Sequence, residues 1–359
     1  MKKLVLFGVL VFLCGMVFPR TSMAKVVFQD NFDSQSDWVP APGSACNQNG
    51  PCPGMPEGWT FYRSMGLWNP PEGNSTIMIN GDHHHGPTGK AFTVWNESNA
   101  GGSGDGWGAD GILAKTLDQD YPELYIQFWI KVQPQWPWPG DSNGQVKVFR
   151  AMHYDRSGDF FTFFSNGNSA PYYIEDFENS LNYGGYRQSH SFRCAPQQDY
   201  YYCGGDSSAD PHWTELPWSG GPDRSIAEPG EIGDGNWHRW VIHLKINTKT
   251  GSTWNNDGVI QFWQDGVLEY SRTDMHWMMG GDTPLGWNSV AIGGNAFGAW
   301  LSDSYKAERW YSIDDVVAST TPIPADYVIG GSSSGSDTSG TTGTTTVAPP
   351  SDLQIIQQK

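Results

Sequence analysis

Two segments between residues 234 and 270 alternate strictly between apolar and polar side chains, and this pattern limits the fold more than any other feature of the chain. Successive side chains of a β-strand point to opposite faces of its sheet, so the alternation predicts two strands. The apolar positions are Trp240, Ile242, Leu244, Ile246, Ile260 and Phe262, and the opposite positions include Arg239, His243, Lys245, Gln261 and Trp263. A solvated face would carry mostly Lys, Glu, Thr and Ser, whereas His, Arg, Trp and Gln are typical of a surface that binds sugars.

The first 24 residues have the three parts of a secretory signal. A basic start at Lys2 and Lys3 precedes an apolar run to about Phe18 and small residues up to Ala24. We therefore expect residues 1–24 to be removed and the mature protein to be secreted to the extracellular side. The apolar run is too short for a membrane span, and no other segment predicts one. Cys14 leaves a lipoprotein open, although the preceding residue is not the small one that lipoprotein processing prefers.

Without that signal the chain is strongly acidic. The sequence has 21 basic and 38 acidic residues, and the loss of Lys2, Lys3 and Arg20 leaves 18 basic residues and a net charge of −20. Such a charge excludes general binding to nucleic acid or to an anionic membrane. It does not exclude an anionic substrate at one locally basic site.

Four cysteines remain in the mature chain, and an even number in an exported protein favours disulfides. Their short separations favour Cys46–Cys52 and Cys194–Cys203, although four cysteines allow three pairings. Zinc is the alternative, but no histidine accompanies either pair at ligand spacing.

Residues 25–330 have no clear linker and no long amphipathic helix pattern, which favours one large all-β domain. Residues 331–359 begin with a stretch rich in Gly, Ser and Thr that cannot bury a core, so we expect a disordered C-terminal tail. Long loops are expected at 41–59 and 183–231. Strands are expected at 26–28, 76–79, 91–95, 124–132, 145–154, 160–164, 237–246, 259–263, 267–271 and 312–319.

Three short motifs resemble the secreted jelly rolls of the concanavalin A-like lectin and glucanase superfamily. Residues 28–33 with Trp38 are similar to the first strand of that family, residues 237–266 to its central strands, and residues 311–320 to its last strand. The resemblance implies a jelly-roll sandwich of two antiparallel sheets, with adjacent first and last strands and a concave face that grips a glycan. It implies no single activity, because the superfamily contains lectins, glycoside hydrolases and polysaccharide lyases.

Polar alternation on four strands indicates where a glycan would bind. For any one strand a solvated outer face is equally compatible, but the shared pattern predicts polar faces that converge in one groove. The candidate substrate-binding residues are Gln127, Trp129, Lys245, Gln261 and Trp263, and the candidate catalytic residues are Gln145, Lys147, Arg150, His153, Arg239 and His243. Arg150 falls on the apolar parity of its strand, so either a β-bulge or a local pairing places it in the groove, or the register of the strand differs there.

We favour a polysaccharide lyase that cleaves a uronate-containing, anionic glycan by β-elimination. This reaction needs a cation or amide to neutralise the carboxylate, a base for the C5 proton and an acid for the leaving oxygen. The candidates are Gln145, Lys147, Arg150 and Arg239 for the first role, His153 and His243 for the second, and Tyr154, Tyr172 and Tyr173 for the third.

Two other functions stay open. A non-catalytic lectin or matrix protein needs the tryptophans and amides but not the histidines. A glycoside hydrolase would use Asp176 and Glu178, whose side chains lie about 6–7 Å apart if their segment is extended. The Glu-x-Asp-x-x-Glu strand of the retaining glucanases of this superfamily is missing, and an acidic loop is the simpler interpretation of residues 175–178. Trp136 and Trp138 form either a sugar platform or a packed turn.

Metal ions have two candidate sites. The jelly-roll resemblance implies a structural calcium where the first and last strands meet, near Asp30, Asp33, Asp314 and Asp315, and hydrogen-bonded turn aspartates are the alternative. Histidines 83–85 resemble a metal tract. Because three consecutive histidines of a strand cannot all reach one ion, we expect a loop there.

Overall fold

The computed structural model describes residues 25–46, 52, 54–64, 75–97, 111–134, 144–156, 170–180, 185–195, 233–281, 285–294, 296–297 and 308–330. The chain divides into two units, Met1–Ile329 and Gly330–Lys359, and all of these residues except Gly330 belong to the first. The expected signal at 1–24, the tail at 331–359, the strand at 160–164, Trp136, Trp138 and Cys203 lie outside the described residues.

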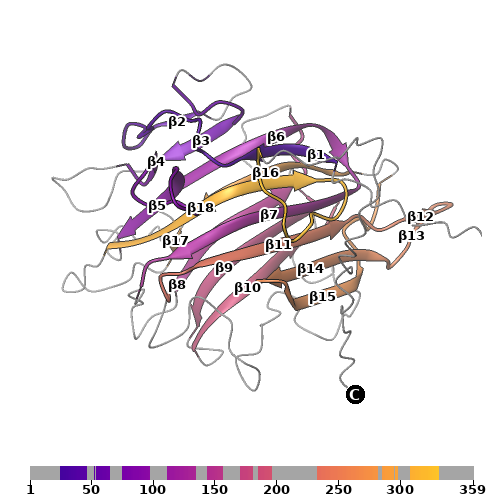
Figure 1. The fold of residues 1–359 in the computed structure, drawn as a ribbon. Coiled ribbons are helices and arrows are strands. Elements are labelled where there is room, and N and C mark those ends of the chain that lie inside the picture. The colour runs from indigo at the N-terminus through magenta and orange to yellow at the C-terminus, as the bar shows by residue number, and fades with distance from the viewer. Residues whose placement is uncertain are drawn as a thin grey trace, which may run out of the picture. The chain divides into compact units, whose positions relative to one another are not determined.

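The first sheet, sheet A, has eight antiparallel strands (Figure 1). In spatial order these are β15 (Val267–Met275), β14 (Gly258–Gln264), β11 (Trp237–Lys245), β7 (Glu123–Val132), β18 (Glu308–Ser319), β5 (Ala91–Glu97) and β4 (Ile77–Asn80). The eighth strand, β1 (Val26–Asp30), pairs with β18, so the first and last strands are adjacent as the resemblance implies. Every strand of sheet A overlaps a segment that the sequence predicts to be extended.

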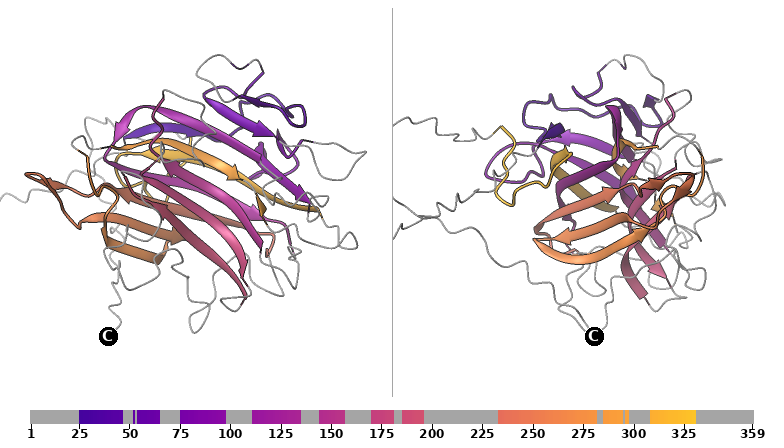
Figure 2. Two further views of the ribbon diagram at one scale, coloured as in Figure 1. Left: turned by 180° about the vertical axis from the view of Figure 1, so that it is seen from behind. Right: turned by 90° about the vertical axis from the view of Figure 1, so that its right-hand side faces the viewer.

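The second sheet, sheet B, also has eight antiparallel strands and lies behind sheet A in Figure 1; the left view of Figure 2 shows it from the back. Its order is β10 (Gly185–Arg193), β9 (Tyr172–Ser180), β8 (Gly144–Met152), β16 (Trp287–Gly294), β6 (Gly111–Tyr121), β3 (Phe61–Ser64) and β2 (Ala45–Cys46), with β17 (Ala296–Phe297) paired to β8. A separate hairpin joins β12 (Lys249–Thr250) to β13 (Thr253–Trp254). Only β8 overlaps a predicted strand, and β10 contradicts the loop predicted at 183–231.

The two sheets pack face to face over one hydrophobic core. The alternating apolar residues of sheet A point into it as predicted, and Trp240 is fully buried there. Ring contacts join the sheets: Phe128 of β7 stacks on Phe149 of β8 at 5.2 Å between centroids, and Phe177 of β9 meets Trp240 edge to face at 5.9 Å. The predicted all-β jelly-roll sandwich is therefore confirmed.

Sheet B is buried on its outward face as well as on its core face. On β16, Val290 and Ile292 belong to the core between the sheets, whereas the intervening Ala291 belongs to a second buried cluster. The members of this cluster are Phe61, Ile112, Ala114, Met152, Tyr154, Tyr172, Ile174 and Ala291. A strand that is covered on both sides loses its two-residue alternation, which explains why the sequence does not predict most of sheet B.

One of the predicted disulfides, Cys46–Cys52, is present and ties the end of β2 to the loop that follows it. Cys194 is also disulfide-bonded, and its predicted partner Cys203 lies outside the described residues. Nowhere in the described part of the chain is there a helix that could cross a bilayer.

Candidate functional site

The predicted polar residues do not converge in one groove. One group lies on β7, β11 and β14 of sheet A, and we call it the sheet A polar face: Gln127, Trp129, Arg239, His243, Lys245, Gln261 and Trp263. The other group, Gln145, Lys147, Arg150 and His153, lies on β8 of sheet B or directly after it. Because the sheets share one core, their outward faces point away from each other. The prediction of one groove is wrong because alternation indicates which face of a strand is polar but not which sheet the strand joins.

Arg239 on the sheet A polar face is held by its neighbours. Its Nε and Nη2 donate to Oε1 of Gln127 at 2.9 and 2.5 Å, and Nη2 also donates to the carbonyl oxygen of Pro324 at 3.1 Å. Burial lowers the pKa of its guanidinium. A cation with this many protein acceptors is positioned as a structural crosslink between β7, β11 and the segment after β18.

His243 has protein partners on both ring nitrogens. Nδ1 lies 2.9 Å from Oε1 of Gln261, Nε2 lies 2.7 Å from Oε1 of Glu123, and the ring stacks on Tyr125 with centroids 4.1 Å apart. Burial and then the charge of Glu123 raise the pKa of Tyr125 to about 12. A general base needs a nitrogen within reach of the substrate proton, and both nitrogens of His243 are engaged.

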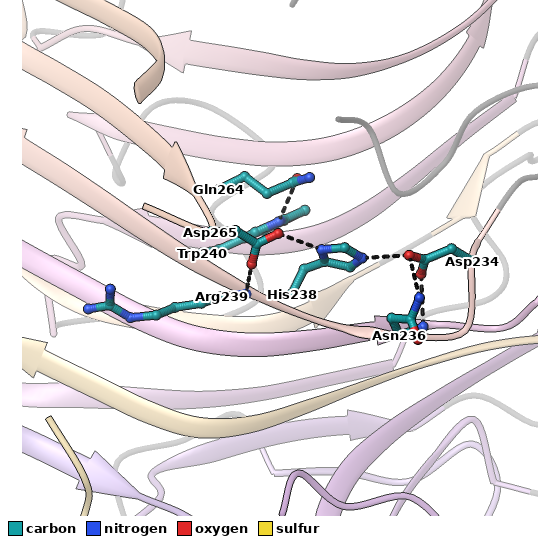
Figure 3. Close-up of polar contacts among 7 residues, drawn as sticks. All are labelled: Asp234, Asn236, His238, Arg239, Trp240, Gln264 and Asp265. Atoms are coloured by element: carbon teal, nitrogen blue, oxygen red, sulfur yellow. Dashed lines mark hydrogen bonds and ion pairs between the residues drawn. The ribbon is translucent and has the colours of Figure 1, made fainter. Parts of the chain in front are cut away.

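The turn after β14 is fastened to the start of β11 by one histidine, which Figure 3 shows between two carboxylates. His238 Nδ1 lies 2.7 Å from Oδ2 of Asp265, and its Nε2 lies 3.0 Å from Oδ2 of Asp234. The other oxygen of Asp265 accepts the backbone amide of Arg239 at 2.9 Å. Asp265 has a φ of 51°, a left-handed conformation that these contacts hold in place.

Histidines 83–85 lie in the loop before β5, as expected, and two of them cover indole rings of sheet A. His83 stacks on Trp310 with centroids 3.7 Å apart, and His85 stacks on Trp129 at 3.9 Å. Burial lowers the pKa of His83. One face of Trp129, a predicted sugar platform, is therefore occupied by the protein itself.

The aspartates predicted to bind calcium have N–H partners. Oδ2 of Asp30 accepts the Trp59 indole at 2.7 Å and the Gln35 amide at 2.8 Å, while Oδ1 accepts a backbone amide at 2.8 Å. Such donors occupy the oxygens that a calcium ion needs. Among the described residues no group of three or more His, Cys, Asp and Glu side chains is arranged to hold a metal.

Asp314 and Asp315 have similar contacts. Oδ2 of Asp314 accepts the backbone amide of His85 at 2.8 Å, its Oδ1 accepts that of Asp315 at 2.7 Å, and Asp315 Oδ2 lies 2.8 Å from Nδ1 of His85. Burial raises the pKa of Asp314 to about 8, and the charges of Asp315 and Asp33 act in the same direction. Asp33 accepts the Asn31 side-chain amide at 2.8 Å and the backbone amide of Lys90 at 3.1 Å. The contacts of all four aspartates are those of the alternative, hydrogen-bonded turn aspartates.

A β-bulge on β8 places Lys147 and Arg150 on the same face of sheet B. Three positions separate them, which in a regular strand would put them on opposite faces. The register with β9 shifts between Lys147 and Phe149, so β8 has one extra residue there and the two cations share the outward face. Of the alternatives that the parity of Arg150 leaves open, the structure shows the bulge.

The β16 neighbours of these two cations are small. Arg150 pairs with Ala291 of β16, and its Nη1 donates to the carbonyl oxygen of Gly293 at 3.1 Å. At Gly294 a Cβ would lie 2.4 Å from the carbonyl oxygen of Lys147, so only glycine fits there. Lys147 is 5% exposed and Arg150 is fully buried. Lys and Arg side chains are rarely buried this deeply unless they are paired, so these two do not belong to a merely solvated face.

Strands β9 and β10 extend the same face. Asp176 pairs with Lys147 in register and is fully buried, which corrects the interpretation of residues 175–178 as a loop. Tyr172 belongs to the outward cluster, and the guanidinium carbon of Arg193 lies 5.7 Å from the centroid of its ring. We call Lys147, Arg150, Tyr172, Asp176 and Arg193 the β8–β10 face. The side chains of Gln145 and Glu178 lie outside the described part of the structure.

Tyr173, another candidate acid, faces the core instead. Its hydroxyl contacts Glu175, whose carboxylate also accepts from Gln188 Nε2 at 2.5 Å and lies 2.6 Å from Nδ1 of His190. All four side chains are fully buried between the sheets, and burial raises the pKa of Tyr173 well above its usual value. Tyr173 points between the two sheets and not to an outward face, so the role predicted for it is wrong.

His153 lies at the end of sheet B, one residue beyond β8. Its Nδ1 is 3.2 Å from Oδ2 of Asp120 and 3.2 Å from the carbonyl oxygen of Gly286. These contacts join the end of β8 to Asp120, near the end of β6, and to Gly286, just before β16. His153 therefore lies beside the β8–β10 face rather than among its cations.

No family model matches the chain, and no curated protein matches it. Among solved structures, the endo-β-1,4-glucuronan lyase of the fungus Trichoderma reesei is 13% identical, with a TM-score of 0.45 over 74% of this chain and 92% of that one. An alginate lyase from Chlorella virus is 13% identical, with a TM-score of 0.40 over 68% of this chain and 89% of that one. The botulinum neurotoxin serotype C1 binding domain is 11% identical, with a TM-score of 0.33 over 79% of this chain and 49% of that one. At these values the likeness does not decide the activity.

Proposed function

We propose that the chain is an exported carbohydrate-active enzyme, a polysaccharide lyase that cleaves a uronate-containing glycan on the β8–β10 face. The observation that carries this proposal is the bulge of β8, which sets Lys147 and Arg150 side by side on one face. A strongly acidic protein repels a polyuronate in general, so a site for one requires concentrated local cations. The β8–β10 face has three cationic side chains and one carboxylate.

In this proposal Arg150 neutralises the substrate carboxylate, which requires its guanidinium, fully buried here, to become accessible from the outward face of sheet B. A guanidinium stays charged at any physiological pH and can donate two parallel hydrogen bonds to a carboxylate. Pairing the carboxylate with a cation lets it accept the negative charge that develops when the adjacent C5–H bond breaks. This contribution grows towards the transition state, which is what catalysis requires.

Lys147 is the proposed base, and Tyr172 is the proposed acid. Lys147 in its neutral form takes the C5 proton, the electron pair of that bond forms the C4–C5 double bond, and the C4–O4 bond breaks. Tyr172 donates its hydroxyl proton to the leaving O4. Lysine is one of the side chains that enzymes use as a general base. Tyr172 replaces Tyr173 because it lies on the outward face with Arg150.

The test is incubation of the purified protein with a panel of polyuronates, measuring both ultraviolet absorbance and new reducing ends. Glucuronan and alginate are the first polysaccharides to test, because they are named as the substrates of the lyases with a similar fold. A lyase produces the absorbing unsaturated uronate together with each new end. New ends without absorbance would indicate a glycoside hydrolase, the role that Asp176 and Glu178 would serve. Binding without either signal would indicate a lectin. Both of these outcomes contradict the proposal.

A further inference from the structure

A pocket of about 530 Å³ opens beside the β12–β13 hairpin, and it shares no residue with the sheet A polar face or the β8–β10 face. Its walls come from the hairpin and from the segment that follows β15, and they include Lys249, Trp254, His276, Met279 and Gly281. A cavity of this volume is large enough for a sugar unit, since ligand pockets begin at about 300 Å³.

Hydrogen bonds fix the hairpin side of the pocket. The side-chain amide of Asn255 donates to the hydroxyls of Thr248 at 2.7 Å and Thr250 at 3.0 Å. Thr248 in turn donates from its hydroxyl to Asp257 at 2.6 Å and from its backbone amide at 2.7 Å. A short hairpin held by this many hydrogen bonds is preorganised, so ligand binding does not carry the entropy cost of ordering it.

The second wall is fastened to the first through one carbonyl group. The carbonyl oxygen of Gly281 accepts the Trp254 indole at 3.2 Å and the Lys249 ammonium at 3.1 Å. Asn247 bonds the backbone of Met278 in both directions, at 2.7 and 2.9 Å. The pocket therefore keeps its shape between two anchored segments.

The chemistry of the lining selects an anion with an apolar face. Nζ of Lys249 lies 5.1 Å from the centroid of the Trp254 ring, so a positive charge and an indole occur together. Met279 is 36% exposed and adds apolar surface, while His276 adds a titratable imidazole. In the described part of this acidic chain, the lining contains no carboxylate at all. A pyranose that bears a carboxylate has the matching features, an apolar C–H face and a negative charge.

We propose that this pocket is a second, non-catalytic binding site for one uronate unit of a polysaccharide. The choice of a uronate rests on the proposed function, whereas the preference for an anionic ring rests on the lining alone. Such a site would hold a long glycan on the enzyme while the β8–β10 face cleaves it, because linking two binding events raises the effective concentration of the second.

Calorimetric titration of the full chain with short glucuronan oligosaccharides tests this proposal. Cello-oligosaccharides are the neutral control, because they have the same backbone without carboxylates. Titrations in a Lys147→Ala background prevent cleavage of the probe. We expect two sites for the charged probe. In the Trp254→Ala and Lys249→Gln variants the affinity of the pocket site should fall by about tenfold or more, and the affinity of the other site should stay unchanged. Lys245→Gln on sheet A is the matched control and leaves both sites intact.

Equal stoichiometry and affinity in the parent background and both pocket variants would overturn the proposal, as would equal binding of the neutral probe. Lys249→Gln removes a charge at the edge of the hairpin, so it remains informative if Trp254→Ala does not fold. The titration requires no turnover. A protein that binds the charged probe in the pocket but cleaves no polyuronate would contradict the proposed function and leave this inference standing.

Discussion

The outward faces of the two sheets carry similar residue types but differ in what those residues contact. On the sheet A polar face Arg239 is held by Gln127, and His243 is held between Glu123 and Gln261. On the β8–β10 face Arg150 also has a protein acceptor, the carbonyl oxygen of Gly293, and a bulge sets it on the same side of β8 as Lys147. Residue type alone therefore does not identify a binding surface. The sheet to which a strand belongs, and the bulges along it, decide which side chains share a face.

The largest effect is expected from replacing the cations of the β8–β10 face. Arg150→Gln should lower turnover on the best polyuronate by a factor of about 1,000, because it removes the charge that stabilises the transition state. Lys147→Ala should lower it by about 100-fold or more, because it removes the base. Steady-state rates of ultraviolet absorbance measure both.

The matched controls are Arg239→Gln and His243→Ala on sheet A, which remove the same kinds of group from the opposite face. Their turnover should stay close to that of the unaltered protein. If instead the sheet A variants lose turnover and the β8 variants keep it, the assignment of the two faces is reversed.

A second, smaller effect distinguishes the faces by stability. His243→Ala should lower the free energy of unfolding by about 1–3 kcal/mol, because it leaves Glu123 and Gln261 without a buried partner. Lys245→Ala, two positions along the same strand and face, should change it by less than about 0.5 kcal/mol. Urea denaturation measures both values. A His243→Ala protein of unchanged stability would show that the network around this ring is not a structural crosslink.

Sheet A could be predicted from the sequence because its outward face is polar and its inward face is not. Ile242 and Leu244 alternate with His243, and this alternation can be read from the strand's own sequence without knowing which strands pair with it. Sheet B could not be predicted in the same way. All eight residues of β16 are buried, so the strand shows no alternation. On β9 and β10 the core face carries Glu175 and His190, whose mutual contacts make burial of polar groups tolerable.

The candidate site was predictable only in part. The sequence indicates that Lys147 and Arg150 are unusual on β8, but its parity argument leaves a bulge, a local pairing and a shifted register open. The partners Asp176, Tyr172 and Arg193 depend on the pairing of β9 with β8 and β10, which no local pattern shows. The sheet A residues were predicted from type and alternation. The partners of Arg239 and His243 depend on the pairing of their strands and could not be read from that alternation.

Asp314 on sheet A gives a third, pH-dependent test. Its pKa is about 8 in the folded protein against an ordinary value of 3.8, chiefly because the carboxyl is buried. Between these pH values the folded state holds one proton more than the unfolded state. The contribution of this group to stability is therefore fully present below about pH 4 and is lost progressively as the pH rises to about 8.

Asp314→Asn should remove that loss. Relative to the unaltered protein, the variant should gain stability by about 1 kcal/mol for each pH unit between 5 and 8, on top of a constant offset from the altered hydrogen bonds. Denaturation curves at a series of pH values measure the slope. A difference between the two proteins that does not vary with pH would refute the raised pKa.

The smallest effect is expected at Trp263 on β14. The sequence alone predicts a central sugar anchor there, whose removal would weaken glycan binding by about 1–3 kcal/mol. Because Trp263 lies on sheet A, Trp263→Ala should leave the affinity for oligouronates unchanged within the error of a calorimetric titration. A loss of binding free energy of about 1–3 kcal/mol would instead indicate that the glycan binds on the sheet A polar face.

The most direct test of the central claim is a crystal structure of the Lys147→Ala protein with a bound oligouronate. We expect the sugar on the outward face of sheet B, with one carboxylate accepting hydrogen bonds from the guanidinium of Arg150 and its ring next to Tyr172. A sugar stacked on Trp263 over Arg239 and His243, with the β8–β10 face unoccupied, would contradict the proposed site.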